Sequence, residues 1–226
     1  MNMQMKKILY LIIVTISTFS LSGQQVYLET GMTISSFGYK DSEGNSLDNM
    51  HGEIHNFMKV GFRTYSPVKR LNYFAGISFN KYGAKGSDES VGNYFDWNVA
   101  YLGLEMGAYY EIYKKRYAIR NLSDLTFYLK ASVTPEFLVY GTQTINSNVY
   151  DVLGIEQFKY PFLFARGGCG VNYYISKTFT LFLQYMGGRG FPLKFGDRED
   201  KEKLRLNSHN IGFGLSIDLP TYFVKK

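Results

Sequence analysis

The chain has 226 residues and a single cysteine, so its length suits one domain and an internal disulfide is impossible. Its formal net charge of +6 is too weak a bias to indicate a nucleic-acid partner. Tyr, Phe and Gly are abundant and Pro is scarce, with counts of 20, 18, 23 and 5, which favours long paired strands.

The first 23 residues predict a cleaved signal peptide. Lys6 and Lys7 precede an apolar run over residues 8–16, and small or polar residues fill positions 17–23. This run is too short for a comfortable membrane helix, and no later segment suggests one. We therefore expect a leader at 1–23 and one domain at 24–226. Loss of Lys6 and Lys7 lowers the net charge from +6 to +4.

After residue 23, apolar residues alternate with small or polar ones in eight segments. A two-residue period places one set on each face of a β-strand. It is clearest in the last segment, where Ile211, Phe213, Leu215, Ile217 and Leu219 alternate with Asn, Gly, Ser and Asp. The predicted strands cover residues 25–37, 55–65, 72–82, 97–112, 125–140, 160–175, 178–189 and 206–219.

The connections between these strands alternate in length. Residues 66–71 and 176–177 are short, and residues 38–54, 83–96, 141–159 and 190–205 are long. Short periplasmic turns and long extracellular loops are typical of outer-membrane barrels. We therefore predict an all-β fold: an eight-stranded, antiparallel, up-and-down transmembrane β-barrel. The rival is a soluble barrel with its apolar face inward, but the glycine-rich polar face suits a cramped interior better.

With this pattern the mature chain resembles the small bacterial outer-membrane barrels of the OmpA/OmpX-like or PorT-like kind. The last strand is similar to the assembly signal of such proteins, with Asn210, Gly212, Leu215 and Ile217 at its characteristic positions. The resemblance implies location in the cell outer membrane, with outer-membrane lipid and lipopolysaccharide as surroundings. A PorT-like protein would also have protein partners in the outer membrane or periplasm.

Charged residues recur on the face predicted to point inward. Because a lone buried charge is very costly, we expect them to pair with residues on neighbouring strands. The predicted pairs are Glu29 with Arg63, Glu105 with Lys130, and Glu136 with Arg166. Such a network either fills the barrel or lines a gated path, and eight strands leave little more than side-chain space. The full set is Glu29, Lys59, Arg63, Glu105, Lys130, Glu136 and Arg166.

One connection on the periplasmic side is long and basic. It spans residues 113–124 and carries Lys114, Lys115, Arg116 and Arg120. Such a segment is most often a solvated turn without a binding role. The alternative is a docking site for a periplasmic partner or an acidic polymer.

Aromatic residues gather at the predicted strand ends, as interfacial girdles do. Tyr82, Tyr94, Trp97 and Tyr150 are among those expected at the outer ends. The inner ends carry Tyr110, Tyr113 and Tyr173, among others.

Candidate catalytic or metal-binding residues are few. Ser208 and His209 raise the possibility of a lipid-modifying enzyme, but they point to opposite faces of a strand and no acid orients the histidine. His51 and His55 lie four apart, a spacing that binds zinc on a helix but not in the loop and strand expected here. We expect no cofactor and no metal.

The sequence thus indicates a non-enzymatic structural or accessory subunit of an outer-membrane export or assembly complex. A narrow channel or small-ligand binder that uses the polar interior is the first alternative. A lipid-modifying enzyme is the second.

Overall fold

The computed structural model describes residues 24–40, 50–88, 93–115, 125–153, 160–193 and 203–219. The signal-peptide prediction for residues 1–23 lies outside these ranges and stays a prediction. No helix in the described part is long and apolar enough to cross a membrane. The strands are β1 (Gln24–Lys40), β2 (His51–Tyr65), β3 (Leu71–Asp88), β4 (Asn93–Lys115), β5 (Leu125–Ile145), β6 (Asn148–Asp151), β7 (Phe162–Tyr174), β8 (Phe179–Pro192) and β9 (Lys203–Asp218).

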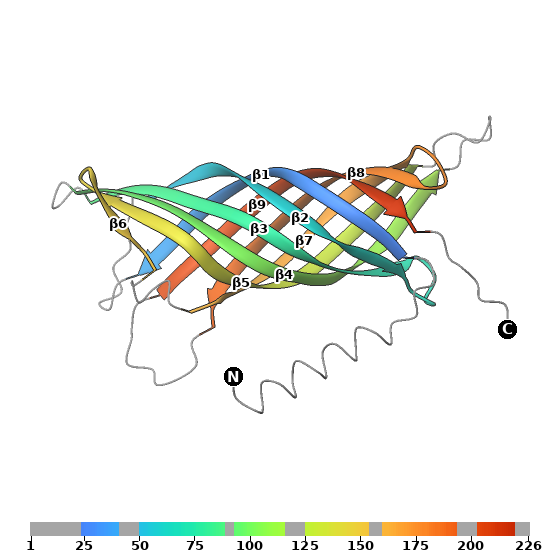
Figure 1. Cartoon of the computed structure of the whole chain (residues 1–226), viewed down its shortest axis with the longest axis horizontal. Coiled ribbons are helices and arrows are strands. Elements are labelled where there is room, and N and C mark those ends of the chain that lie inside the picture. The colour runs from blue at the N-terminus through green and yellow to red at the C-terminus, as the bar shows by residue number, and fades with distance from the viewer. Residues whose placement is uncertain are drawn as a thin grey trace, which may run out of the picture.

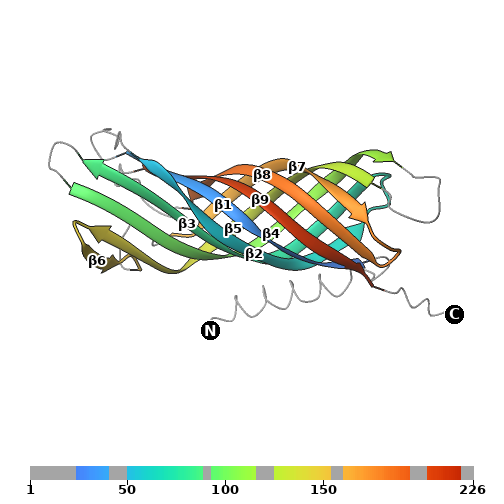
Figure 2. The ribbon, with the colours of Figure 1, turned by 90° about the horizontal axis from the view of Figure 1, so that it is seen from above.

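Eight of these strands close into one antiparallel barrel, which confirms the predicted fold (Figure 1). Strands adjacent along the barrel pair in the order β4-β3-β2-β1-β9-β8-β7-β5, and β4 pairs with β5 to complete the ring. Closure leaves none of these eight described strands at an open edge of the sheet, a requirement for crossing lipid. β1 begins and β9 ends at the same end of the barrel, as Figures 1 and 2 show. We call this the periplasmic end, because short turns at 66–70 and 175–178 also lie there.

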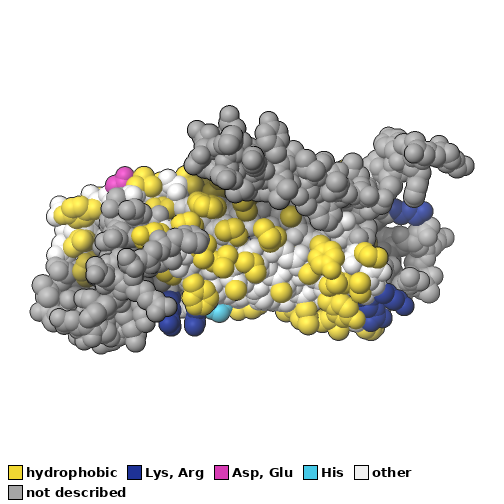
Figure 3. All heavy atoms as spheres, turned by 90° about the horizontal axis from the view of Figure 1, so that it is seen from below, with side chains coloured by type: hydrophobic (Ala, Val, Ile, Leu, Met, Phe, Trp, Pro, Cys, Tyr) yellow, Lys and Arg dark blue, Asp and Glu magenta, His cyan; other side chains and the backbone are white. Residues whose placement is uncertain are grey.

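The two-residue period decides which side chains face lipid. Along the first half of β5, buried and outward-facing residues alternate strictly. Outward positions carry large apolar side chains such as Leu28, Met106, Leu129 and Phe213, each about half exposed. Figure 3 shows hydrophobic side chains spread over much of the uncovered part of one face of the barrel. Glycine and polar residues take the inward positions, so this barrel is apolar outside and polar inside.

The strands run further outward than the sequence predicted. Residues 83–88 continue β3, residues 93–96 begin β4 and residues 141–145 end β5, although all were expected in loops. Beyond the membrane the outer face need not be apolar, so the hydrophobic period fades while backbone pairing continues. β5 then turns into β6 through Asn146 and Ser147, whose φ angles of 48° and 73° fit a tight hairpin turn.

This extension corrects part of the predicted outer aromatic girdle. Tyr82 and Trp97 were expected at the membrane surface, but both point into the barrel, because the inward parity of β3 and β4 continues past the predicted ends. At the periplasmic end Tyr110, Tyr113 and Tyr173 do face outward.

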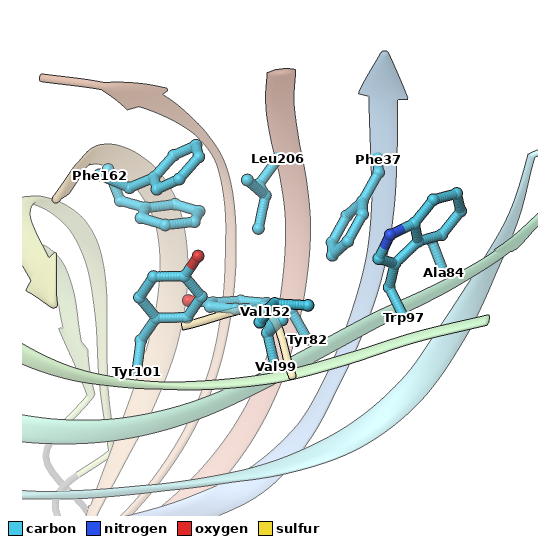
Figure 4. Packing of buried hydrophobic residues seen from close by; sticks show 10 residues of the cluster. Phe37, Tyr82, Ala84, Trp97, Val99, Tyr101, Val152, Phe162 and Leu206 are labelled. Carbon is cyan, nitrogen blue, oxygen red and sulfur yellow. The ribbon is translucent and has the colours of Figure 1, made fainter. Parts of the chain in front are cut away.

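Two clusters of apolar and aromatic side chains occupy the interior. The outer apolar plug lies near the extracellular end and includes Val152, which folds inward from the segment after β6 (Figure 4). The inner aromatic cluster lies toward the periplasmic end. The plug consists of Phe37, Tyr82, Ala84, Trp97, Val99, Tyr101, Val152, Phe162, Phe164 and Leu206, and the inner cluster of Tyr27, Phe74, Tyr109, Tyr128 and Phe182.

Candidate functional site

The candidate site is the charged network inside the barrel. All seven charged residues predicted to face inward are buried, each with at most 5% of its surface exposed. Four are cationic and three are anionic, so these seven residues together carry one excess positive charge. The structure thus confirms which residues line the interior, but it redistributes their partners.

Glu136 on β5 is the most densely bonded of these groups. Its carboxylate accepts hydrogen bonds from Arg166 Nη2 at 2.7 Å, Asn80 Nδ2 at 2.9 Å and the Tyr82 hydroxyl at 2.8 Å. Arg166 also donates to the Tyr82 hydroxyl at 2.6 Å and covers the Phe164 ring, 4.2 Å from its centroid. The predicted Glu136–Arg166 pair is therefore present.

The partners of Glu105 and Glu29 differ from those predicted. Glu105 Oε1 lies 3.2 Å from Lys59 Nζ, and Glu29 Oε2 lies 3.9 Å from Lys130 Nζ. The predicted Glu105–Lys130 and Glu29–Arg63 pairs were wrong, because only partners on adjacent strands were considered. Long side chains in so narrow a barrel reach across it.

A small residue on β3 makes the Lys59–Glu105 contact possible. Lys59 is opposite Ser78, and Glu105 is opposite Gly76, so β3 lies between the two charged residues. The space over Gly76 is taken by Tyr27, whose hydroxyl would lie 2.7 Å from an added Cβ. The small side chain of Ser78 leaves Lys59 and Glu105 free to meet across β3.

Gln184 on β8 extends the network around Glu29. Its amide nitrogen donates to Glu29 Oε1 at 2.6 Å. Its amide oxygen accepts from the Tyr128 hydroxyl at 3.0 Å and from Lys130 Nζ at 3.4 Å. Lys130 also lies 4.2 Å from the centroid of the Phe74 ring. The ammonium group thus meets a carboxylate, an amide and an aromatic face.

Arg63 is held by aromatic rings. Its guanidinium lies 4.2 Å from the Phe182 centroid, 5.0 Å from Tyr27 and 5.5 Å from Tyr109. It also donates to Ser216 Oγ at 3.3 Å. A cation–π contact of this kind is worth about 2 kcal/mol or more when it is desolvated.

Glycines leave room for two of the carboxylates. A Cβ added at Gly212 would lie 2.5 Å from Glu29 Oε1, and one added at Gly103 would lie 3.0 Å from Glu136 Cγ. Gly212 belongs to the predicted assembly signal on β9, with Asn210, which donates to Thr33 at 3.1 Å. In the same strand Leu215 is half-buried and Ile217 faces outward. Their part in assembly stays a prediction.

Several buried polar atoms in the interior have no hydrogen-bond partner among the protein atoms described. Buried groups of this kind are usually satisfied by water. Such atoms occur both in the polar part of the lumen and in the outer apolar plug and the inner aromatic cluster that lie on either side of it. These atoms include Tyr27 OH, Tyr101 OH, Glu105 Oε2, Ser132 Oγ, Thr134 Oγ1 and Arg166 Nε.

At the outer end, Lys85 pairs with Glu53, with 2.6 Å between Nζ and Oε1. The hydrogen bond to Glu53, followed by the charge of that carboxylate, raises the pKa of Lys85. This pair is partly exposed, unlike those in the lumen.

The histidines form no recognisable catalytic or metal site within the described residues. His209 faces outward, and its Nδ1 lies 2.6 Å from the Tyr185 hydroxyl, while Ser208 is buried on the opposite face. The described residues bring no three His, Cys, Asp or Glu side chains together as a metal site requires, His51 and His55 included.

The basic periplasmic connection is only partly described. Lys114 and Lys115 are the last residues of β4, where their backbone pairs with Thr126 and Leu125. Arg116 and Arg120 lie outside the described residues, so the docking hypothesis stays a prediction.

The sequence missed Tyr82 and Asn80 as members of the Glu136 cluster. Both occupy even positions on β3, the inward set, and lie within the predicted strand at 72–82, so extending the inward set to its uncharged polar residues would have found them. The site and the wall together define a small transmembrane β-barrel of the outer-membrane type, with a filled polar interior.

No family model and no curated protein matches this chain. Among solved structures, it is similar to Neisserial surface protein A, with 12% identity over 86% of this chain and 97% of that one, at a TM-score of 0.43. It is also similar to the outer membrane protein OprG from Pseudomonas aeruginosa, with 13% identity over 86% and 95%, at 0.44. The outer membrane protease OmpT from Escherichia coli matches at 9% identity over 89% and 98%, also at 0.44.

Proposed function

We propose that this protein is a non-enzymatic structural or accessory subunit of an outer-membrane export or assembly complex, as a PorT-like protein would be. It acts through its outer wall and its two ends, with protein partners in the outer membrane or periplasm. Its wall also contacts lipopolysaccharide.

The observation that carries this proposal is the filled interior. Arg166 and Glu136 bridge β7 and β5, and Lys130 and Glu29 bridge β5 and β1. The outer apolar plug and the inner aromatic cluster lie on either side of this layer. A lumen occupied by paired charges and aromatic rings favours action through the exterior.

The outer ends of β3, β4 and β5 offer a surface for such action. β3 and β4 stay paired as far as Asp88 and Asn93, and the β5–β6 hairpin adds a further pair of strands. Val149, Tyr150 and Leu153 are each at least half exposed on this hairpin segment. Exposed apolar side chains outside the lipid band suit a protein contact.

Extraction in a gentle detergent, followed by identification of the proteins that remain bound, tests the proposal. We expect defined partners to co-purify, and fewer of them when Lys114, Lys115, Arg116 and Arg120 are all replaced by serine. The matched control is Lys69→Ser with Lys177→Ser, at exposed positions in the short periplasmic turns. A clean monomer from the unaltered protein would contradict the subunit role. A chemical change in lipid A that cells make with the unaltered protein, but not with His209→Ala, would contradict the non-enzymatic role.

The second candidate function is a narrow channel or small-ligand binder. It is favoured by the unpartnered buried atoms, such as Tyr101 OH and Arg166 Nε, which a ligand or a file of water could satisfy. Steady single-channel currents, or a small molecule retained through purification, would support this alternative over the subunit role.

A further inference from the structure

The apolar wall is interrupted at the outer ends of β8 and β9 by a group of polar side chains. Arg189 lies opposite Asn207, and Gly187 lies opposite His209. Figure 3 shows basic side chains and a histidine lying together at the border of the yellow wall. We call this group the outer polar patch. Its members are Tyr185, Arg189, Arg205, Asn207 and His209, all on the outward face of the two strands.

Hydrogen bonds across the two strands organise the patch. Arg189 Nε donates to Asn207 Oδ1 at 2.9 Å. The Tyr185 hydroxyl lies 2.6 Å from His209 Nδ1, and the two rings stack with centroids 6.0 Å apart. These contacts fix two polar pairs side by side on the surface of the wall.

The two arginines carry charge that no described carboxylate neutralises. Arg205 is two residues from Asn207 on the same face of β9, which makes it a diagonal neighbour of Arg189 within reach of a long side chain. Within the described ranges, no Asp or Glu side chain forms an ion pair with either arginine. An arginine on the lipid face of a barrel costs about 2–4 kcal/mol at the bilayer midplane and about 0–1 near its surface. Two of them together therefore point to an anion at the membrane surface.

Beside the patch the wall is almost free of side chains. Gly167 on β7 is opposite Gly187 on β8, which is in turn opposite His209 on β9. A Cβ added at Gly167 would have nothing within 4 Å, whereas one added at Gly187 would lie 3.3 Å from the Tyr185 hydroxyl and 3.6 Å from His209 Nδ1. The strip is therefore open at Gly167 and bordered by the Tyr185–His209 pair at Gly187. Most of the wall carries bulky residues such as Leu183 and Phe213. A flat strip that begins at a basic patch fits the acyl chain of a lipid whose headgroup carries a phosphate.

We propose that the outer polar patch binds a phosphate group of an outer-leaflet lipid, with one acyl chain lying along the Gly167–Gly187 strip. Arg189 and Arg205 hold the phosphate oxygens, because planar guanidinium groups bind phosphate through paired hydrogen bonds. Asn207 orients Arg189, and the Tyr185–His209 pair borders the headgroup. This inference rests on the proposed contact with lipopolysaccharide and is independent of the subunit role.

Native mass spectrometry of the mature chain in detergent micelles tests the site. The probes are lipid A with both phosphates, the same lipid A after removal of its phosphates, and inorganic phosphate alone. We expect phosphorylated lipid A to bind the unaltered protein, and R189Q/R205Q to weaken this binding at least tenfold. The control K69Q/K177Q removes the same charge at exposed positions in the periplasmic turns and should bind as the unaltered protein does.

Three results would overturn the proposal. R189Q/R205Q could bind phosphorylated lipid A as tightly as the unaltered protein, or both forms of lipid A could bind alike. Inorganic phosphate could also displace the lipid completely at equal concentration, which would mark a site for the free anion. If R189Q/R205Q fails to fold, R189K/R205K keeps the charge without the planar fork. The lysine variant should then bind phosphorylated lipid A more weakly than the unaltered protein, and equal binding would refute the arginine geometry.

Discussion

Replacing Glu136 with alanine should destabilise the barrel more than replacing any exposed acid. Glu136 is fully buried and accepts hydrogen bonds from Arg166, Asn80 and Tyr82. Its removal leaves the Arg166 charge buried without a counterion. Breaking a buried pair in this way costs about 3–5 kcal/mol.

The partly exposed pair of Glu53 and Lys85 supplies the matched control. Their side chains keep 20% and 42% of their surface exposed, so water already screens their attraction. Pairs of this kind contribute about 0–1 kcal/mol. Glu53→Ala therefore removes the same functional group and should have little effect.

Urea unfolding in lipid vesicles measures the difference in unfolding free energy between Glu136→Ala and Glu53→Ala. Trp97 is the single tryptophan and packs in the outer apolar plug together with Tyr82, so its fluorescence reports on this end of the lumen. A rescue variant, E136Q/R166M, removes both charges while the glutamine oxygen still accepts from Asn80. It should recover much of the lost stability.

Equal, small losses of stability in Glu136→Ala and Glu53→Ala would show that the buried Arg166 charge does not need Glu136. So would a rescue variant as unstable as Glu136→Ala, because the loss would then not arise from an uncompensated charge.

Two further predictions concern packing and the membrane wall. Gly212→Ala should lower the free energy of unfolding by about 1–3 kcal/mol, because the added methyl group would press on Glu29. Gly167→Ala, on the open wall, should change this free energy little. Equal losses of stability in the two variants would contradict the packing described for Gly212. Cys169 faces outward in mid-barrel, so a charged thiol reagent should not modify it in vesicles, while a lipid-soluble reagent should. A cysteine at position 176 in a C169S background should react with the charged reagent, and rapid charged labelling of Cys169 itself would place the wall in water.

The strand period made the fold predictable because lipid imposes it. Each spanning strand must be apolar on its outer face, so positions such as Leu129 and Phe213 could be assigned from alternation alone. Where β3 leaves the lipid, this constraint ends. The strand was therefore predicted to end at Tyr82, although its pairing with β4 continues to Asp88.

The ion pairs were harder to predict because they depend on distances across the lumen. Burial of a charge demands a partner, and this argument correctly placed Lys59 and Glu105 inside. Which partner each takes depends on how far the side chains reach across the intervening strand β3. The sequence names such residues but does not give the width of the barrel.

The proposed action through the exterior depends on a lumen that is filled by paired charges and aromatic rings. Planar-bilayer recording of the mature chain tests it most directly, with labelling of Cys169 by a lipid-soluble reagent as proof of insertion. A filled lumen should give no steady conductance at either sign of voltage. Large, steady openings from inserted protein would contradict it and favour the channel.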